Sequence, residues 1–373
     1  MCESLKLMYF ADAWEQCKLG EISKMYQPQT ITGAELLSEG IPVFGANGFI
    51  GFYSVANHSE NQVTISARGE GTGTPSYVHG PVWITGNSMV VNVDASDIDK
   101  YFLFANLTAN SLKKYVTGGA QPQLTRDVLI KVPIALPNGD EQAKIGSFFR
   151  ILDNLITLHQ RKLEKIKALK QAYLSEMFPA EGERKPKRRF PEFTDAWEQC
   201  KFEKLVSRVS LMGRGEPDLP CIEYEDIVSG QGQLNKDIYE KKSTKNGIRF
   251  EPGDVLFGKL RPYLKNWLLP DFTGIAVGDW WVLRPQDTNG EFIYTLIQSP
   301  KYQMVSNLST GTKMPRSDWS VVSKTAFSVP SDMAEQIRIG AVFRDLDNLI
   351  TLHQRKLEKL QNIKQAYLNE MFV

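Results

Sequence analysis

The sequence predicts an α+β protein in which two mixed α/β domains are separated by two long antiparallel helices that form a coiled coil. Three observations predict this fold. One long segment occurs twice, a short motif occurs twice ahead of it, and the blocks between these repeats alternate β-type runs with helical segments. The chain therefore carries an internal repeat, and we expect a pseudo-twofold relation between its halves.

The long repeated segment is nearly identical in its two copies. Residues 141–178 align without a gap on residues 335–372, and both contain the string NLITLHQRKLEK. The short motif, DAWEQCK, runs from Asp12 to Lys18 and again from Asp195 to Lys201. Each half is therefore a short motif, a variable block and a long segment.

Both long segments are predicted to be helices with one apolar face. Their apolar residues recur at three, four and seven positions, and Leu155 and Leu169 stand beside this face. Asn138 and Asp332 are good N-caps, each with a glutamate three residues on, as in a capping box. We expect the apolar face to pair the helices and to serve partner docking; its members are Leu152, Ile156, His159, Leu163, Ile166 and Tyr173 in the first copy and Leu346, Ile350, His353, Leu357, Leu360 and Tyr367 in the second.

Chain order predicts the direction of the pairing. The first helix ends just before the second variable block, and the second helix leaves that same block. If the two apolar faces are buried against each other, the second helix returns toward the first block. Phe372 should then approach Trp14 as Phe178 approaches Trp197, with one variable domain at each end of the pair and with neighbouring chain termini.

The variable blocks are predicted to share one mixed α/β fold with different surfaces. Both contain short β-rich runs broken by Gly and Asn turns, then a helix, then a loop with Gly and Thr. The β-rich runs are residues 41–53, 61–73 and 80–93, then 253–269 and 274–285, and the helices are 95–115 and 290–306. We place the first recognition domain at 1–137, the central helix at 138–178, a charged linker at 179–193, the second recognition domain at 194–331 and the last helix at 332–373.

Composition narrows the class of protein. A chain of 373 residues that is 42% hydrophobic is long enough for two domains with their own cores. We find no signal peptide and no stretch as long as a membrane span, so we expect a cytoplasmic protein without membrane contact. The four cysteines are too few for a disulfide framework and are expected to be reduced. The net charge of +1 lacks the basic excess of many nucleic-acid-binding domains.

We predict no catalytic residue, metal site or cofactor on this chain. GANGFIG at Gly45 lacks the strand-to-helix context of a nucleotide-binding turn, so we interpret it as a structural turn. RGEGTGTPSY at Arg68 lacks a Walker lysine, and its glycines fit either a plain loop or a DNA contact. No Cys/His pair has metal spacing, no Gly-x-Ser-x-Gly elbow occurs, and the Asn/Asp-Pro-Pro-Tyr/Phe motif of DNA adenine methyltransferases is missing.

Basic, aromatic and amide side chains interleave in the loops of both blocks. Such sets suit phosphate contacts and base-edge readout, although an ordinary solvated surface carries them too. Trp280 and Trp281 are expected in the core, and the linker string KPKRR fits either phosphate contact or solubility. The DNA-binding candidates are Arg68, Tyr77, Lys113, Lys114, Gln121, Gln123 and Arg126 in the first block and Lys241, Lys242, Lys259, Arg261, Tyr263, Lys265, Lys313 and Arg316 in the second.

With DAWEQCK, IPVFGANGFIGFY, GDVLFGKLRPYLKN and the twice-used helix, the chain resembles the specificity subunits of Type I restriction-modification systems over essentially its whole length. The resemblance implies that each variable block is a target recognition domain and that the subunit catalyses nothing itself. It also implies two modification subunits, which use S-adenosylmethionine to methylate adenine N6. Restriction subunits that use ATP and Mg are implied in the larger complex.

Repeated helices and unlike blocks suit this implied role. Two equal helices offer equivalent docking surfaces to two identical partners, and two unlike domains read unlike halves of a bipartite double-stranded DNA target. A helix of about 39 residues is about 58 Å long, or roughly 17 base pairs at about 3.4 Å each, which sets an upper limit on half-site separation. The alternative is a non-catalytic coiled-coil adaptor with two ligand-binding domains. A free-standing DNA enzyme is disfavoured by the missing motifs.

Overall fold

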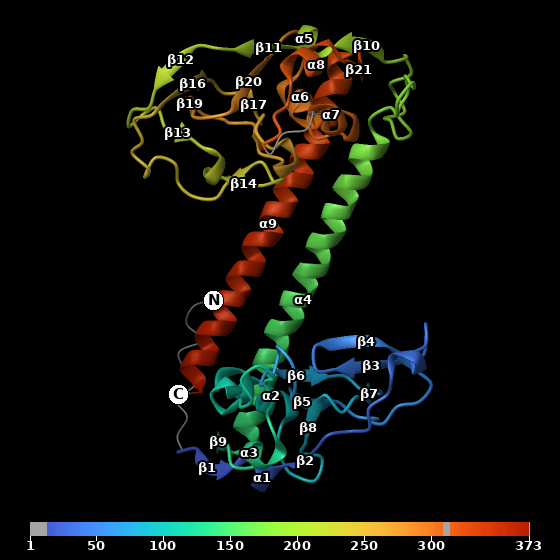
Figure 1. Ribbon diagram of the computed structural model, residues 1–373, viewed down its shortest axis with the longest axis vertical. Helices are drawn as coiled ribbons and strands as arrows, with labels where there is room; N and C mark the ends of the chain where they lie inside the picture. Colours follow the sequence, from blue (N-terminus) through green and yellow to red (C-terminus); the bar gives the residue numbers. More distant parts are fainter. Residues whose placement is uncertain (1–12, 309–313, 373) are drawn as a thin grey trace. The chain divides into compact units, whose positions relative to one another are not determined.

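The computed structural model describes residues 13–308 and 314–372, which form two compact units (Figure 1). Unit 1 contains the described residues up to 159 together with 356–372, and unit 2 contains the described residues of 160–355. Each unit thus combines one variable block with a part of each long helix. Within the described ranges, every helix is too short or too polar to span a membrane.

Unit 1 is built on a four-stranded antiparallel sheet with strand order β2-β8-β5-β6. Helix α2 contacts β5 and β6, so Leu103 of the helix and Val63 and Ile65 of the central strand share one buried core. A smaller sheet, ordered β4-β3-β7, stands beside it. The elements are β2 (Lys24–Tyr26), β3 (Ile41–Gly45), β4 (Gly48–Tyr53), β5 (Gln62–Ser66), β6 (Pro75–Val78), β7 (Trp83–Ile84), β8 (Ser88–Asn92), α1 (Leu19–Ile22), α2 (Lys100–Ala109), α3 (Arg126–Leu129), η1 (Gly33–Glu35) and η2 (Leu112–Tyr115).

Unit 2 has a central four-stranded sheet like that of unit 1, but its second sheet differs. Its central sheet, β11-β20-β17-β18, buries Val255, Phe257 and Leu283. Its second sheet has four strands, β12-β16-β19-β13, and β14 pairs with β15. The elements are β11 (Val206–Val209), β12 (Met212–Arg214), β13 (Cys221–Ile222), β14 (Ile227–Val228), β15 (Gln233–Leu234), β16 (Asn246–Phe250), β17 (Val255–Gly258), β18 (Trp267–Leu268), β19 (Gly274–Ala276), β20 (Trp280–Pro285), α5 (Phe202–Leu205), α6 (Gly290–Leu296), α7 (Pro300–Ser306), α8 (Trp319–Lys324), η3 (Tyr224–Asp226) and η4 (Pro262–Leu264).

The repeated short motif forms an edge strand in both units. In unit 1, β1 (Glu15–Lys18) pairs antiparallel with β9 (Pro133–Leu136), which places Cys17 opposite Ile134. In unit 2, β10 (Glu198–Lys201) pairs in the same register with β21 (Ala326–Val329), which places Cys200 opposite Phe327. The strand that enters each long helix is therefore fixed by the short motif of the same unit.

The long helices begin where the sequence predicts. Helix α4 spans Gly139–Glu176 and α9 spans Met333–Met371. The Asn138 side chain accepts a hydrogen bond from the Glu141 backbone N–H at 3.0 Å, and Asp332 accepts one from Ala334 at 2.8 Å, so both N-caps are confirmed.

The glutamates of the predicted capping boxes also bind the repeated tryptophans. The Trp14 indole donates to Glu141 at 2.9 Å, and the Trp197 indole donates to Glu335 at 3.2 Å. Sequence reasoning assigned these carboxylates to the helix start alone. Their bonds to tryptophan instead tie the two repeated elements of each unit to one another.

The helix segments run antiparallel within each unit. In unit 1, Asp153 of α4 pairs with Lys364 of α9 at 2.6 Å, and the rings of Phe148 and Tyr367 lie 4.9 Å apart. Positions later on α4 thus meet positions earlier on α9, which is the predicted antiparallel direction.

Unit 2 shows the same direction with the copies exchanged. Lys170 of α4 pairs with Asp347 of α9 at 2.6 Å, and the ring centroids of Phe178 and Phe343 are 6.5 Å apart. The expected terminal contacts are confirmed as well. The Phe372 and Trp14 rings lie 5.8 Å apart, and the Phe178 and Trp197 rings lie 6.1 Å apart.

Three predicted elements need correction. The helix expected over 95–115 begins only at Lys100, because Asp99 caps it, and ends at Ala109. The helix expected over 290–306 is two helices, because Ser299 accepts a hydrogen bond from Tyr302 N–H and starts a second one. The β-rich run 253–269 is interrupted by η4, since the left-handed backbone before and after that turn cannot continue a strand.

Candidate nucleic-acid interface

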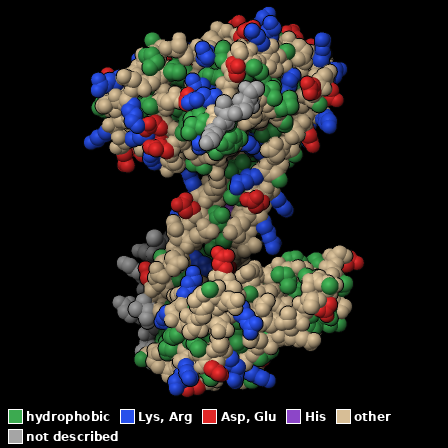
Figure 2. All heavy atoms as spheres, viewed as in Figure 1, with side chains coloured by type: hydrophobic (Ala, Val, Ile, Leu, Met, Phe, Trp, Pro, Cys, Tyr) green, Lys and Arg blue, Asp and Glu red, His purple; other side chains and the backbone are tan. Residues whose placement is uncertain are grey.

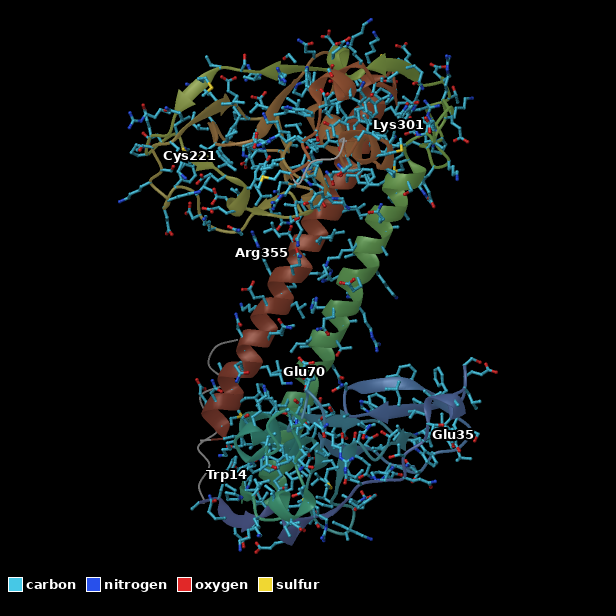
Figure 3. The ribbon with its side chains drawn as sticks, in the orientation of Figure 1. Trp14, Glu35, Glu70, Cys221, Lys301 and Arg355 are labelled. Carbon is cyan, nitrogen blue, oxygen red and sulfur yellow. The ribbon has the colours of Figure 1, made fainter. Side chains whose placement is uncertain are left out.

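Two loops of unit 1 are bonded together at the end of the central strand β5. Leu124 N–H donates to the Ala67 carbonyl at 3.0 Å, and Thr72 Oγ1 donates to the Pro122 carbonyl at 3.2 Å. The backbones of Arg68 and Gln123 form an isolated antiparallel β-bridge. The two loops line an open pocket of about 900 Å³ with Arg68, Gly69, Glu70 and residues 118–123. Figure 3 labels Glu70 on this part of unit 1.

The pocket brings together three predicted residues, Arg68, Gln121 and Gln123, all exposed. Lys113 and Lys114 are exposed on the η2 turn. This turn lies close against the loop that follows β5, because a Cβ atom added to Gly73 of that loop would lie 3.4 Å from the Lys113 backbone nitrogen. Lysines and amides thus gather around one loop surface, which combines phosphate-binding and base-reading chemistry.

Tyr77 and Arg126 are engaged in packing and in hydrogen bonds. The Tyr77 hydroxyl accepts a hydrogen bond from Asn61 at 3.1 Å, and its half-buried ring lies 4.6 Å from that of Tyr101. Arg126 Nε donates to the Met25 carbonyl on β2 at 3.1 Å. Neither residue lines the pocket of unit 1.

Unit 2 presents a loop surface at the corresponding place. Beyond the central strand β17, Leu260 and Arg316 form an isolated bridge just before α8, as Arg68 and Gln123 do just before α3. Arg261 N–H donates to the Pro315 carbonyl at 2.8 Å, which fixes the two segments together. The predicted residue Lys313 lies outside the described residues.

Four predicted residues of unit 2 lie beside this bridge: Lys259, Arg261, Tyr263 and Lys265. Tyr263 is 54% exposed on the η4 turn, between Arg261 and Lys265. Lys265 also lines a pocket of about 300 Å³ with Lys167 and other residues of the helices. An exposed lysine, an exposed aromatic ring and a half-buried arginine therefore lie together on one turn.

Acidic and phenolic groups hold this surface in place. Asp279 pairs with Arg316 at 3.0 Å and with Lys259 at 3.5 Å. The Tyr224 hydroxyl accepts from Leu260 N–H at 3.1 Å and donates to the Asp279 carbonyl. Burial raises the pKa of Tyr224. The hydroxyl thus stays protonated and keeps its role as donor.

Lys241 is committed to carboxylates. Its ammonium contacts Asp226 at 2.8 Å and also bonds Glu223. Burial lowers the pKa of Lys241, but the hydrogen bonds to Asp226 and Glu223 outweigh it and raise the pKa overall. We therefore assign Lys241 a structural ion pair. Its neighbour Lys242 is exposed, with a φ of 42°.

Other sequence interpretations are decided by burial and pairing. Trp280 and Trp281 are 1% and 3% exposed, which confirms them as core residues. GANGFIG forms the β3–β4 hairpin, which confirms a structural turn. In the linker, Arg189 binds Glu335 through two hydrogen bonds of 2.7 and 2.8 Å, and Arg188 binds Glu176 at 2.7 Å. These two arginines hold the linker on unit 2.

The described residues contain no cluster of metal-binding side chains. Within residues 13–308 and 314–372, no group of three or more His, Cys, Asp and Glu side chains is arranged to hold a metal ion. Cys17, Cys200 and Cys221 are free thiols.

Comparison with known proteins identifies the family. The profile described as the Type I restriction modification DNA specificity domain matches residues 11–168 and 221–362. The chain belongs to this family. It is 22% identical over 298 residues to the Type I restriction enzyme MjaVIII specificity subunit of Methanocaldococcus jannaschii, covering 73% of this chain and 69% of that one. It is 30% identical over 145 residues to the EcoprrI specificity subunit of Escherichia coli, covering 38% and 35%.

The fold of this specificity subunit has a solved counterpart. The crystal structure of the S subunit of a Type I restriction-modification system from M. genitalium has a TM-score of 0.73 at 13% identity and covers 100% of this chain and 99% of that one. The predicted family and fold class are thereby confirmed. As a specificity subunit, the chain is a non-catalytic component of a Type I system, which decides against the general adaptor.

Proposed function

We propose that this specificity subunit reads a bipartite, asymmetric double-stranded DNA target, with one half-site bound by unit 1 and the other by unit 2. The supporting observation is the pair of isolated bridges, Arg68 with Gln123 and Leu260 with Arg316, which stand at the same place in the two units. The frame is the same, whereas the exposed residues around each bridge differ. Equal placement with unequal chemistry suits two unlike half-sites with an unread spacer.

The two surfaces favour different bases. Gln121 and Gln123 of unit 1 carry amides, which pair in a bidentate manner with adenine N6 and N7. Arg261 and Arg316 of unit 2 carry guanidinium groups, which suit guanine O6 and N7 or phosphates. Lys113, Lys114 and Lys265 add sequence-independent phosphate contacts.

A second part of the proposal concerns protein partners. Each unit exposes one leucine pair from the repeated string: Leu155 and Leu158 are 37% and 46% exposed in unit 1, and Leu349 and Leu352 are 43% and 46% exposed in unit 2. These pairs occupy equivalent positions in the two copies. Two identical modification subunits would find the same apolar contact twice. S-adenosylmethionine would bind those subunits, and restriction subunits with ATP and Mg would join the larger complex.

The half-site proposal is tested with the chain co-expressed with its modification subunits. Methylome sequencing gives the wild-type target, and the measurement is repeated for Arg316→Ala and for Gln121→Ala with Gln123→Ala. Each variant should relax one half-site only, by about 1–3 kcal/mol or roughly 5- to 150-fold in discrimination per lost bidentate contact. Arg249→Ala, an exposed arginine on β16, is the matched control. Equal relaxation of both half-sites by either variant would contradict the proposal.

The docking proposal is tested by native mass spectrometry of the assembled complex. Leu155→Asp with Leu158→Asp should reduce the number of bound modification subunits from two to one, because the unaltered pair in unit 2 keeps its partner. Adding Leu349→Asp and Leu352→Asp should remove the second. Thr157→Asp, at an exposed position on the same helix, is the control. Two bound subunits on the four-site variant would rule out these leucines as the docking contact.

A further inference from the structure

The η4 turn of unit 2 ends in an apolar tip. Tyr263 is 54% exposed and Leu264 is 39% exposed, at adjacent positions. Met314, 52% exposed, precedes the Pro315 carbonyl that binds Arg261 and thus lies beside the turn. Hydrophobic and basic side chains lie close together on the visible face of this unit (Figure 2). Exposed apolar side chains that stand next to one another are typical of a surface that contacts a partner.

The turn that carries this tip is rigidly supported. Leu264 N–H donates to the Arg261 carbonyl at 2.8 Å, and Lys265 N–H donates to the Pro262 carbonyl at 2.9 Å. The Lys265 carbonyl accepts from Gly230 N–H at 2.9 Å, which ties the turn to a neighbouring loop. Arg261 and Lys265 hold φ values of 49° and 56°, a conformation that non-glycine residues adopt only where the surrounding structure enforces it.

The charges around the tip favour DNA over protein as its partner. Arg261 and Lys265 flank the tip with positive charge, and Arg316, which is paired with Asp279, lies beside it; together these cations complement phosphates. Unit 1 offers a contrast at its β3–β4 hairpin, where Phe49 is 53% exposed. Residues 27–67, which contain that hairpin, hold no lysine or arginine and three glutamates, one of them Glu35 beside the hairpin (Figure 3).

We propose that Tyr263 and Leu264 insert between two base pairs of the half-site bound by unit 2, and this inference rests on the proposed function. A wedge of this kind needs an apolar tip that replaces base stacking, a rigid support, and cations that hold the phosphates on both sides of the opened step. The η4 turn has all three. The half-site of unit 2 is then read partly through the ease with which one base step unstacks, whereas Gln121 and Gln123 of unit 1 read base edges.

The test uses the complete complex and duplexes that carry the target found by methylome sequencing, with the half-site of unit 2 assigned by Arg316→Ala. Affinities are measured by fluorescence anisotropy for the intact duplex and for duplexes with an abasic site at each successive position of that half-site. Tyr263→Ala with Leu264→Ala should weaken binding to the intact duplex roughly 10- to 100-fold. An abasic site at the wedge position opens the step in advance and should reduce this loss to less than about 3-fold.

Two variants separate the wedge from other causes. Tyr263→Phe keeps the ring and should bind as the wild type does. Tyr239→Ala removes an equally exposed ring of unit 2, 52% exposed and 6.2 Å from Phe272, and should have no effect. Any loss of affinity in Tyr239→Ala would measure the general cost of removing a surface tyrosine.

Each remaining outcome overturns a defined part of the inference. An equal loss on intact and abasic duplexes would make the tip an ordinary surface contact. Loss of bound modification subunits from the double variant would make it a protein-docking surface. If the wild type binds its target specifically and the double variant binds it equally well, the wedge is wrong while the proposed function stands. A wild-type complex without sequence-specific binding would remove the proposed function as well.

Discussion

Unit 1 and unit 2 use the same frame to present different surfaces. In both, a tryptophan of the short motif binds the first-turn glutamate of a long helix, Trp14 with Glu141 and Trp197 with Glu335. Frame residues come from the repeated segments and loop residues from the variable blocks. The comparison teaches that duplication keeps the place of presentation constant while the displayed chemistry is free to change.

The ion pairs between α4 and α9 show where residues of the variable blocks contact the repeated helices. The Asp153–Lys364 and Asp347–Lys170 pairs both measure 2.6 Å and occupy equivalent repeat positions. In unit 1, the Tyr101 hydroxyl also donates to Asp153 at 2.9 Å. In unit 2, Lys170 also donates to Gln298 at 2.8 Å, and burial raises the pKa of Asp347 against the opposing effect of Lys170. The same pair therefore depends more heavily on its lysine in unit 2.

The largest effect should come from breaking these pairs. Lys170→Ala leaves the Asp347 carboxylate, which is only 20% exposed, without its cation and should destabilise unit 2 by about 3–5 kcal/mol. Lys364→Ala should cost only about 1–2 kcal/mol in unit 1, because Asp153 keeps the Tyr101 hydroxyl. Hydrogen exchange of α4 and α9 peptides measures each unit separately.

A double variant controls for the lost lysine side chain. Lys170→Met with Asp347→Leu removes both charges, and it should be close to wild type if the loss in Lys170→Ala comes from an unpaired charge. Equal losses in the two single variants would show that the variable blocks do not modulate the frame.

The next effect should come from the linker, residues 179–193, which belongs to unit 2. Arg189 is 14% exposed and binds Glu335, itself 1% exposed, through two charge-assisted hydrogen bonds. Arg189→Ala should therefore destabilise unit 2 by about 2–3 kcal/mol. Arg188→Ala, which breaks the exposed pair with Glu176, should change the protection of unit 2 very little, because solvent screens an exposed ion pair. A similar loss of protection in both variants would place the stabilisation in the linker charge rather than in the buried pair.

The frame was predictable because it rests on local and periodic signals. Repeats and helical periodicity gave the helices, N-caps gave their starts, and chain order gave the antiparallel direction together with the approach of Phe372 to Trp14. None of these signals requires knowledge of distant contacts. They indicate the frame even though the two variable blocks share little sequence.

The surface was predictable only in part, because pairing over distance decides which charges are available. Lys241 looked like a phosphate contact until its bonds to Glu223 and Asp226 were known. Tyr77 was likewise a DNA-binding candidate by residue type and loop position, and its ring packs on Tyr101. In contrast, Arg68 and Gln123 were predictable as residue types, and only the fold brings them into one bridge.

A smaller effect should follow acidification, and it should appear in unit 2. Hydrogen bonds from Lys241 and Lys245 lower the pKa of Glu223 from 4.5. Burial raises the pKa of Asp226, but hydrogen bonds from Lys236 and Lys241 outweigh it and lower the pKa below 3.8. Carboxyls with lowered pKa stabilise the folded state above their ordinary pKa, and this stability is lost as the pH falls through the lowered values.

Peptides of η3 and β16 should therefore lose exchange protection below about pH 4, ahead of the central sheet of unit 1. Lys241→Met should remove much of this acid step and lower protection at neutral pH instead. Simultaneous acid unfolding of both units, unchanged in Lys241→Met, would exclude the cluster as its cause.

The smallest effect should come from the tryptophans, and it tests how equal the two frames are. Trp14→Phe and Trp197→Phe each remove one indole hydrogen bond to a glutamate and keep an aromatic ring beside Phe372 or Phe178, so each should cost about 1 kcal/mol. Unit-specific hydrogen exchange measures the two losses side by side. Similar values would mean that the indole acts as one interchangeable part of a duplicated frame. A clearly larger loss for Trp197→Phe would mean that Arg189 and the indole hold Glu335 cooperatively, and unit 2 would then be the more tightly specified half of the molecule.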